Sequence, residues 1–225
     1  MIIGNGLIAN LFRENDRENV VFFASGVSNS LETDKSAFLR EENLIRKTIK
    51  ENPNKIFIYF STCSIYDSSK NGSSYVNHKL KMEQIVEELA NQFLILRVSN
   101  AVGKGGNPNL LMNYLVNAFH QEKEITVHTL ATRNLIDADD VKNITLKFIN
   151  ENSFNKIINV AYLENFSTIQ ILEILEKHFN KTAKISLVKS GQSYLISIPE
   201  AEAYFAENKL TEKKEYLLRI IKRYY

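Results

Sequence analysis

Tyr75 and Lys79 are the residues of this sequence whose types and spacing best suit acid–base chemistry. Four residues apart on a helix, they would share one face, with Cβ atoms about 6 Å apart. A lysine cation beside a phenol favours the phenolate and lowers the tyrosine pKa from its usual value of about 10. A hydroxyl from the strand-like run that ends in Ser61-Thr62-Cys63-Ser64 could hydrogen-bond the same substrate oxygen. Together these groups predict a proton relay for making or breaking a C–OH bond while hydride moves elsewhere.

The same spacing also suits an ordinary amphipathic helix with a surface tyrosine and an extended lysine, so the surrounding elements must decide. Apolar runs at 20–24, 55–60 and 93–98 are expected to be strands buried on both faces. A very short strand at 1–3 precedes them, and helices are expected at about 34–50 and 75–88. Strand–helix alternation predicts a doubly wound parallel sheet, with loops rich in Gly, Ser, Thr and Asn at one edge.

Beyond residue 104 the rhythm changes, and a smaller second part is expected to fold onto the first. Helices are expected at about 110–121, 139–150, 167–179 and 211–224, and strands at 124–130, 156–161 and 184–188. We expect Asp137, Asp139 and Asp140 to cap the helix that follows them and to favour its dipole.

The run Gly4-Asn5-Gly6-Leu7-Ile8-Ala9 follows the first strand and opens a helix, as a dinucleotide fingerprint does. The first glycine permits a tight turn, and the second lets the backbone approach a pyrophosphate near the helix N-terminus. The alternative is a plain glycine turn between a strand and a helix. The fingerprint also expects an acid about 20 residues on to hold the adenosine ribose. That position falls at 23–25, where no acid stands.

Composition narrows the function classes. The 225 residues suit one domain or one domain with a small appendage. With 28 basic and 26 acidic residues the chain has no strong electrostatic attraction to nucleic acid or membrane. Neither a membrane span nor a signal peptide is predicted. The single cysteine, Cys63, fits a reducing compartment and a structural role in a strand, so we expect a cytoplasmic protein. The histidines show no metal spacing, and His78 is expected to face solvent.

Taken together, the motifs resemble those of the extended short-chain dehydrogenase/reductase family, the nucleotide-sugar epimerases, dehydratases and ketoreductases. The resemblance covers almost the whole chain in order. The glycine turn at 4–9, the strand at 20–25 and the hydroxyl-bearing strand at 57–66 resemble the family's cofactor-binding half. Tyr75 and Lys79 match its Y-x-x-x-K pair. The runs 96–103 and 133–141 are similar to "L-R-Y-F-N-P-V-G" and "R-D-Y-I-H-V-x-D-L".

The resemblance implies a role for each matching residue and an NAD or NADP cofactor. The implied catalytic residues are Thr62, Tyr75 and Lys79, with Lys79 also holding the nicotinamide ribose. The implied cofactor-binding residues are Gly4, Asn5, Gly6, Leu7, Ile8, Ala24, Ser25, Gly26, Tyr75 and Lys79. The implied substrate-binding residues are Ser61, Asn100 and Arg133, which would take a nucleotide-linked sugar. Alternatively, Asn100 only satisfies backbone groups, and Arg133 pairs with Asp137 or Asp139.

The resemblance also bears on the reaction. A dehydratase of the family carries Asp-Glu after the catalytic hydroxyl, where this chain has Cys63-Ser64, so ketoreduction or epimerisation in polysaccharide or glycoconjugate biosynthesis is favoured.

Dimers in the family pair two helices from each subunit, which would here be about 35–50 and 75–91. A homodimer is therefore expected, with Leu39, Ile45, Ile49, Ile85, Val86 and Leu89 either in its seam or in the sheet core.

Two departures from the family limit what carries over. Only about ten residues separate Ala9 from Val20, where the family has a much longer segment containing its second and third strands. Thr62 and Tyr75 are also closer in sequence than is usual. The expectation is a Rossmann-like core at 1–103 that lacks those two strands, with sheet contributions from later residues, and a C-terminal α+β substrate subdomain at 104–225. A catalytically degenerate member that binds a nucleotide sugar or a partner without hydride transfer, or an enzyme that uses another nucleotide, is the alternative.

Overall fold

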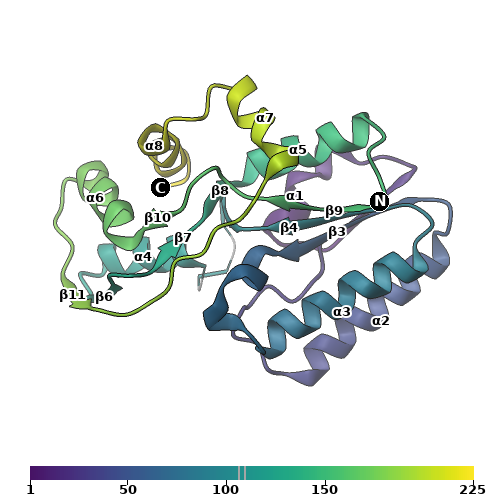
Figure 1. Ribbon diagram of the computed structural model, residues 1–225, viewed down its shortest axis with the longest axis horizontal. Helices are drawn as coiled ribbons and strands as arrows, with labels where there is room; N and C mark the ends of the chain where they lie inside the picture. Colours follow the sequence, from purple (N-terminus) through teal and green to yellow (C-terminus); the bar gives the residue numbers. More distant parts are fainter. Residues whose placement is uncertain (106, 109) are drawn as a thin grey trace.

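The computed structural model describes residues 1–105, 107–108 and 110–225. At its centre lies a five-stranded, all-parallel sheet in the order β1-β2-β3-β4-β9, with β1 at one edge (Figure 1). The sheet confirms the predicted doubly wound α/β class. Its strands are β1 (Ile2–Ile3), β2 (Val20–Phe23), β3 (Ile56–Thr62), β4 (Phe93–Val98) and β9 (Lys156–Val160).

Helices cover both faces of this sheet, which is why every residue of β2 and β3 is buried. On one face lie α2 (Lys35–Glu51) and α3 (Ser74–Leu89), packed against each other and the sheet (Figure 1). On the other lie α1 (Leu7–Leu11) and α5 (Ala138–Asn150). The Asp34 side chain caps α2 by accepting from the backbone N–H of Ser36 at 2.8 Å, so the sequence placed this helix start correctly.

The residues expected in a dimer seam divide between core and surface. Ile45, Ile49, Ile85 and Val86 pack against the sheet, whereas the side chains of Leu39 and Leu89 are exposed. Most of the expected seam therefore belongs to the monomer's own core. The homodimer stays a prediction, which light scattering showing only a 25.9 kDa particle would contradict.

The second part of the chain is built from short paired strands and helices. Three two-stranded sheets pair β5 with β8, β7 with β10, and β6 with β11. These strands are β5 (Asn100–Val102), β6 (Ile125–His128), β7 (Thr132–Arg133), β8 (Leu135–Asp137), β10 (Phe166–Ser167) and β11 (Ile185–Val188), and the helices are α4 (Leu111–His120), α6 (Thr168–Phe179), α7 (Pro199–Glu207) and α8 (Lys213–Tyr224). The chain crosses back to the core in α5 and β9, so the later residues contribute to the sheet as expected, while the division at 103/104 stays a prediction.

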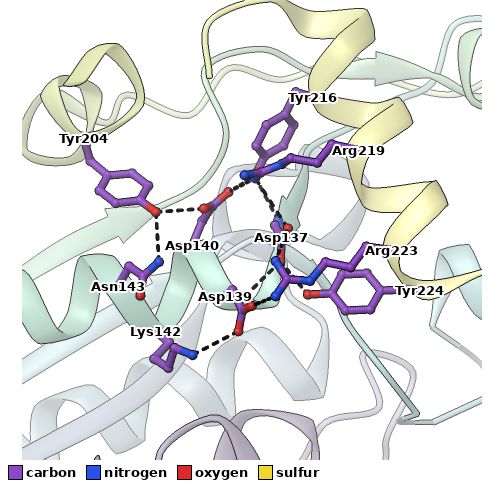
Figure 2. Close-up of polar contacts among 10 residues, drawn as sticks. All are labelled: Asp137, Asp139, Asp140, Lys142, Asn143, Tyr204, Tyr216, Arg219, Arg223 and Tyr224. Atoms are coloured by element: carbon purple, nitrogen blue, oxygen red, sulfur yellow. Dashed lines mark hydrogen bonds and ion pairs between the residues drawn. The ribbon is translucent and has the colours of Figure 1, made fainter. Parts of the chain in front are cut away.

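The C-terminal helices dock on the acidic start of α5 (Figure 2). Asp137 caps α5, accepting from the backbone N–H of Asp139 at 2.9 Å, which confirms the predicted cap. Asp140 accepts hydrogen bonds from the hydroxyls of Tyr204 and Tyr216, both at 2.8 Å, and from Arg219 at 2.6 Å. The aspartates thus anchor α7 and α8 as well as capping their own helix, a tertiary role that the sequence did not reveal.

Gly4 is fixed by backbone geometry at the turn after β1. Its φ is +124°, and a Cβ there would lie 2.4 Å from the carbonyl oxygen of Ala24. Gly4→Ala is therefore expected to lower the free energy of unfolding by at least about 2 kcal/mol, measured by urea denaturation. Gly6→Ala is the matched control, because no atom lies within 4 Å of the added carbon and its φ is −81°. Equal stability of the two variants would contradict this account.

None of the helices in the described part of the chain has the length and apolar character needed to cross a bilayer.

Candidate functional site

The glycine turn and the loop after β2 meet at the carboxyl edge of the sheet. Gly4 approaches the backbone of Ala24 closely, whereas the space beside Gly6 is open. Gly6 begins α1, and its backbone position carries no side-chain cap. Parallel sheets bind ligands at this edge, so the predicted cofactor residues at 4–8 and 24–26 lie where the fold favours a nucleotide.

Thr62 and Ser61 end β3, and their hydroxyls have different partners. The Thr62 Oγ1 accepts from the backbone N–H of Ser64 at 3.0 Å and caps the short helix η2 (Cys63–Tyr66). Within the described residues its own hydroxyl hydrogen has no recorded acceptor, so it can still donate to a ligand. The Ser61 hydroxyl donates to buried Glu83, which also binds Arg97 through 2.6–3.2 Å contacts. Ser61 is thus engaged inside the protein, and its predicted substrate contact stays a prediction.

Tyr75 lies in the first turn of α3 at the same edge. The helix begins after Ser73, whose side chain accepts from the backbone N–H of Val76 at 3.2 Å. The Tyr75 ring clusters with Val27, from the loop after β2, and with Ile65, from η2. The structure therefore brings Tyr75 to the strand-end segment that carries Thr62, although the two are separated by a loop and a second short helix, η3 (Ser68–Lys70).

Lys79 lies one turn further along α3 and is buried, with 2% of its surface exposed. Its Nζ donates to the backbone oxygen of Phe60 at 3.1 Å and to Glu41 Oε1 at 3.2 Å. It also lies 4.5 Å above the centre of the Tyr59 ring, a cation–π contact. The helix confirms the shared face of Tyr75 and Lys79, but the lysine has an acidic partner that no local pattern predicts.

That partner, Glu41, is fully buried on α2. Besides Lys79 it accepts from the backbone N–H of Val27 at 2.7 Å and from the Tyr59 hydroxyl at 2.8 Å, and it lies 2.9 Å from His78 Nε2. Burial would raise the Glu41 pKa, but the Lys79 ammonium and these hydrogen bonds outweigh it and hold the pKa below its ordinary value. Glu41 is therefore a carboxylate, and it forms the centre of a buried polar network.

One sequence-based expectation about this network needs correction. His78 does not face solvent: it is buried, bonded to Glu41, and stacked on Phe38 with ring centres 4.5 Å apart. The pKa of Tyr59 is raised well above its ordinary value by burial and by the Glu41 charge, so its hydroxyl is a donor. No local signal marks Glu41 as buried, because a glutamate in an amphipathic helix normally faces water.

Gly26 closes over the ion pair. A Cβ at this position would lie 2.8 Å from Glu41 Oε1 and 2.9 Å from Lys79 Nζ. A side chain at position 26 would therefore have to displace one of the two charged groups, independently of the predicted contact of Gly26 with a cofactor. Its neighbour Ser25 is held by Arg40, which reaches the Ser25 backbone oxygen at 3.4 Å.

Asn100 and Arg133 lie in the second part of the chain. Both the backbone N–H and the side-chain amide of Asn100 bond to the Asn134 oxygen, at 3.2 and 2.7 Å, as the alternative interpretation of Asn100 expects. Asn100 also lines a cavity of about 20 Å³, room for about one water molecule.

Arg133 donates to the oxygen of Thr132 at 2.8 Å and forms no ion pair within the described residues. The alternative interpretation, in which Arg133 pairs with Asp137 or Asp139, is wrong, because those carboxylates contact Arg219 and Arg223.

Cys63 is a structural thiol, as expected. It is buried, it lies 2.9 Å from the backbone oxygen of Arg97, and burial raises its pKa to about 12. A thiol that is protonated at neutral pH is a poor nucleophile.

A parallel sheet with a glycine turn after its first strand, and with a tyrosine–lysine helix beside a strand-end hydroxyl, defines a Rossmann-like nucleotide-binding protein. Residues 4–161 match the model of the NAD dependent epimerase/dehydratase family, and the chain belongs to this family. It is thus of the NAD-dependent epimerase/dehydratase class of enzymes, which confirms the resemblance drawn from its motifs. A search of curated proteins finds no match.

Several solved structures share the fold. UDP-glucuronic acid 4-epimerase from Bacillus cereus, in complex with UDP-glucuronic acid and NAD, aligns with a TM-score of 0.69 at 19% identity, over 96% of this chain and 79% of that one. UDP-glucose 4-epimerase from Bifidobacterium longum, in complex with NAD+ and UDP, aligns with a TM-score of 0.69 at 15% identity, over 97% of this chain and 82% of that one. dTDP-glucose 4,6-dehydratase from Bacillus anthracis, in complex with NAD, aligns with a TM-score of 0.67 at 16% identity, over 97% of this chain and 78% of that one.

The family's cofactor is NAD, and the edge of this sheet fits part of it. The turn at Gly4 excludes any side chain, and the open space beside Gly6 lets a phosphate approach the backbone. Fewer features of the structure fit the adenosine half of the cofactor. No described strand extends the sheet beyond β1, and no acid occupies the expected ribose position.

Proposed function

We propose that this protein is an NAD(P)-dependent epimerase or ketoreductase of a nucleotide-linked sugar, with Tyr75 as its acid–base. The surroundings of Tyr75 support the proposal: it clusters with Val27, from the segment after β2, and Ile65, from the segment after β3, packs against this cluster. A phenol at that point can reach a ligand held at the carboxyl edge of the sheet. Chemistry of this kind would serve polysaccharide or glycoconjugate biosynthesis.

Each residue of the site has a separate role in the proposed reaction. The bound dinucleotide supplies the hydride acceptor or donor. The Tyr75 phenol exchanges a proton with the sugar oxygen that gains or loses hydrogen, and the Thr62 hydroxyl donates to the same oxygen. Lys79, one turn below, contributes positive charge and a donor for a ribose. The turn Gly4–Ile8 and the segment 24–26 hold the pyrophosphate and the nicotinamide side.

The diphosphate of the substrate is assigned to Arg133. A guanidinium with no carboxylate partner among the described residues offers a planar fork of donors that matches phosphate oxygens. Asn100 is a second candidate through its amide. Neighbouring structures hold UDP-glucuronic acid or UDP, and another is a dTDP-glucose dehydratase, so UDP- and dTDP-sugars are the first substrates to try. Cys63-Ser64 after Thr62 favours epimerisation or ketoreduction over dehydration.

Calorimetric titration with NAD(H), NADP(H) and a panel of UDP- and dTDP-sugars tests the proposal, after identification by mass of any dinucleotide that copurifies. Binding of both a dinucleotide and a nucleotide sugar is expected. Binding of a nucleotide sugar without any dinucleotide would replace the enzyme with the alternative, a family member that binds without hydride transfer. The short segment between Ala9 and Val20 is the observation that keeps this alternative in view.

Arg133→Ala is expected to weaken binding of the nucleoside diphosphate about tenfold, because a charge-assisted hydrogen bond to phosphate contributes about 1.5–3 kcal/mol. Titration with UDP or dTDP alone measures the effect without turnover. Arg46→Ala is the control, since Arg46 pairs with Glu42 on the outer side of α2. Unchanged affinity in Arg133→Ala would remove this residue from the substrate site.

A further inference from the structure

Glu41 holds the Lys79 ammonium at the point from which it would have to reach a ligand. The side chain of Glu41 is fully buried, and that of Lys79 is 3% exposed. The ammonium already has two internal acceptors, Glu41 Oε1 and the oxygen of Phe60. Gly26 lies against both charged groups so closely that even a methyl group there would collide with them. A ribose hydroxyl at the sheet edge therefore meets a buried lysine with two of its three N–H groups already bonded inside the protein.

The network is also balanced in charge. The titratable groups around the pair are Tyr59 on β3, and His78 and Glu83 on α3, with Tyr75 one turn from Lys79. Glu83 is matched by Arg97. Glu41 cancels the charge of Lys79, so an anionic dinucleotide gains little attraction from this lysine while the pair is intact. The same carboxylate thus offsets the charge of the ammonium and occupies one of its three N–H donors.

We propose that Glu41 is a positioning residue that sets the affinity of the site for the nicotinamide ribose and its phosphate by competing with them for Lys79. A ligand oxygen near Lys79 competes with the Glu41 carboxylate for the charge of the ammonium and for the direction of its N–H groups. The carboxylate meanwhile keeps its bonds to Val27, Tyr59 and His78, so it can release the lysine without becoming unsatisfied. The inference rests on the proposed function, because it assumes a dinucleotide at this edge.

A double-mutant cycle on dinucleotide affinity tests the inference without turnover. The variants are Glu41→Gln, Lys79→Met and both together, and NADH binding is measured by its fluorescence and by calorimetry. Glu41→Gln is expected to bind NADH about tenfold more tightly, because an unpaired buried lysine gains a partner in the ligand. Lys79→Met alone should weaken NADH binding by only about two- to threefold, because Glu41 already offsets most of the lysine charge, and the double variant should lose the gain.

Glu42→Gln is the matched control, because it removes the same charge from the next residue of α2, whose ion pairs within the described chain are those with Arg46 and Lys81. Its affinity should equal that of the unaltered protein. Far-ultraviolet circular dichroism checks folding of each variant. If Glu41→Gln does not fold, Lys79→Met decides: a tenfold loss of affinity would show that Lys79 contacts the ligand despite Glu41.

Two results would overturn the inference while leaving the proposed function intact. One is a weaker or unchanged NADH affinity in folded Glu41→Gln, since a merely structural carboxylate would give no gain. The other is a gain that survives in the double variant, which would place its cause outside Lys79. Absence of NADH binding in every variant, the unaltered protein included, would instead overturn both the inference and the dinucleotide-dependent function.

Discussion

Replacing Tyr75 with phenylalanine is expected to lower kcat by about 10²–10⁴-fold, the usual contribution of a positioned general acid or base. The phenol is the only group that the proposal assigns to proton exchange at the sugar oxygen, and phenylalanine keeps the ring that packs on Val27 and Ile65. Dinucleotide affinity and the free energy of unfolding should therefore change little. Turnover is measured with the nucleotide sugar that calorimetry identifies, and binding is measured on the same preparation.

Tyr114→Phe provides the control for loss of a tyrosine hydroxyl, since Tyr114 is half exposed on α4. Normal turnover in Tyr75→Phe would exclude Tyr75 as the acid–base group. A loss of turnover accompanied by a loss of stability would point to packing rather than to chemistry. Only a loss confined to kcat supports the assigned role.

Asp140→Ala is expected to have the largest effect on stability, lowering the free energy of unfolding by about 3 kcal/mol. The carboxylate is buried and accepts from the hydroxyls of Tyr204 and Tyr216 and from Arg219, which belong to α7 and α8 (Figure 2). Alanine would remove the acceptor of both tyrosine hydroxyls and would leave Arg219 with only its 3.4 Å contact to Asp137. Urea denaturation measures the loss, and hydrogen exchange should show that α7 and α8 open first.

Asp139→Ala is the matched control in the same first turn of α5. Asp139 binds Arg223 and Lys142 near the surface, and such pairs contribute less than about 1 kcal/mol. A loss as large as that of Asp140→Ala would show that the charge near the helix start, rather than burial, stabilises the C-terminal helices.

Hydrogen bonding rather than charge explains the role of Asp140. Burial raises the pKa of its carboxyl above the ordinary 3.8, against the opposing effects of Tyr216 and Arg219. The protonated form therefore stabilises the fold most below the ordinary pKa, and this contribution is lost as the pH rises through the raised value. Asp140→Asn keeps one of the two acceptor oxygens and removes the charge, so we expect a smaller loss of stability at neutral pH than in Asp140→Ala.

Much of the core could be predicted because its signals are local. The continuous apolar runs became β2, β3 and β4, and the capping residues Asp34 and Asp137 stand where α2 and α5 begin. The two-residue and three-residue strands of the second part gave no periodicity to detect. Helix α7 was also missed, although Pro199 stands in its first turn, because its hydrophobic pattern is short.

The sequence by itself determined the class of fold, the family and the pairing of Tyr75 with Lys79 on one helical face, since each follows from residue type and spacing along the chain. Only the tertiary structure decided what those residues meet. Glu41 and Lys79 are 38 positions apart and look like ordinary surface charges in their own helices. Folding of α2 against α3 over β3 removes both from water, and a charge taken out of water must find a partner. Such a partner is close in the folded structure but distant in the sequence, so no local sequence pattern predicts it.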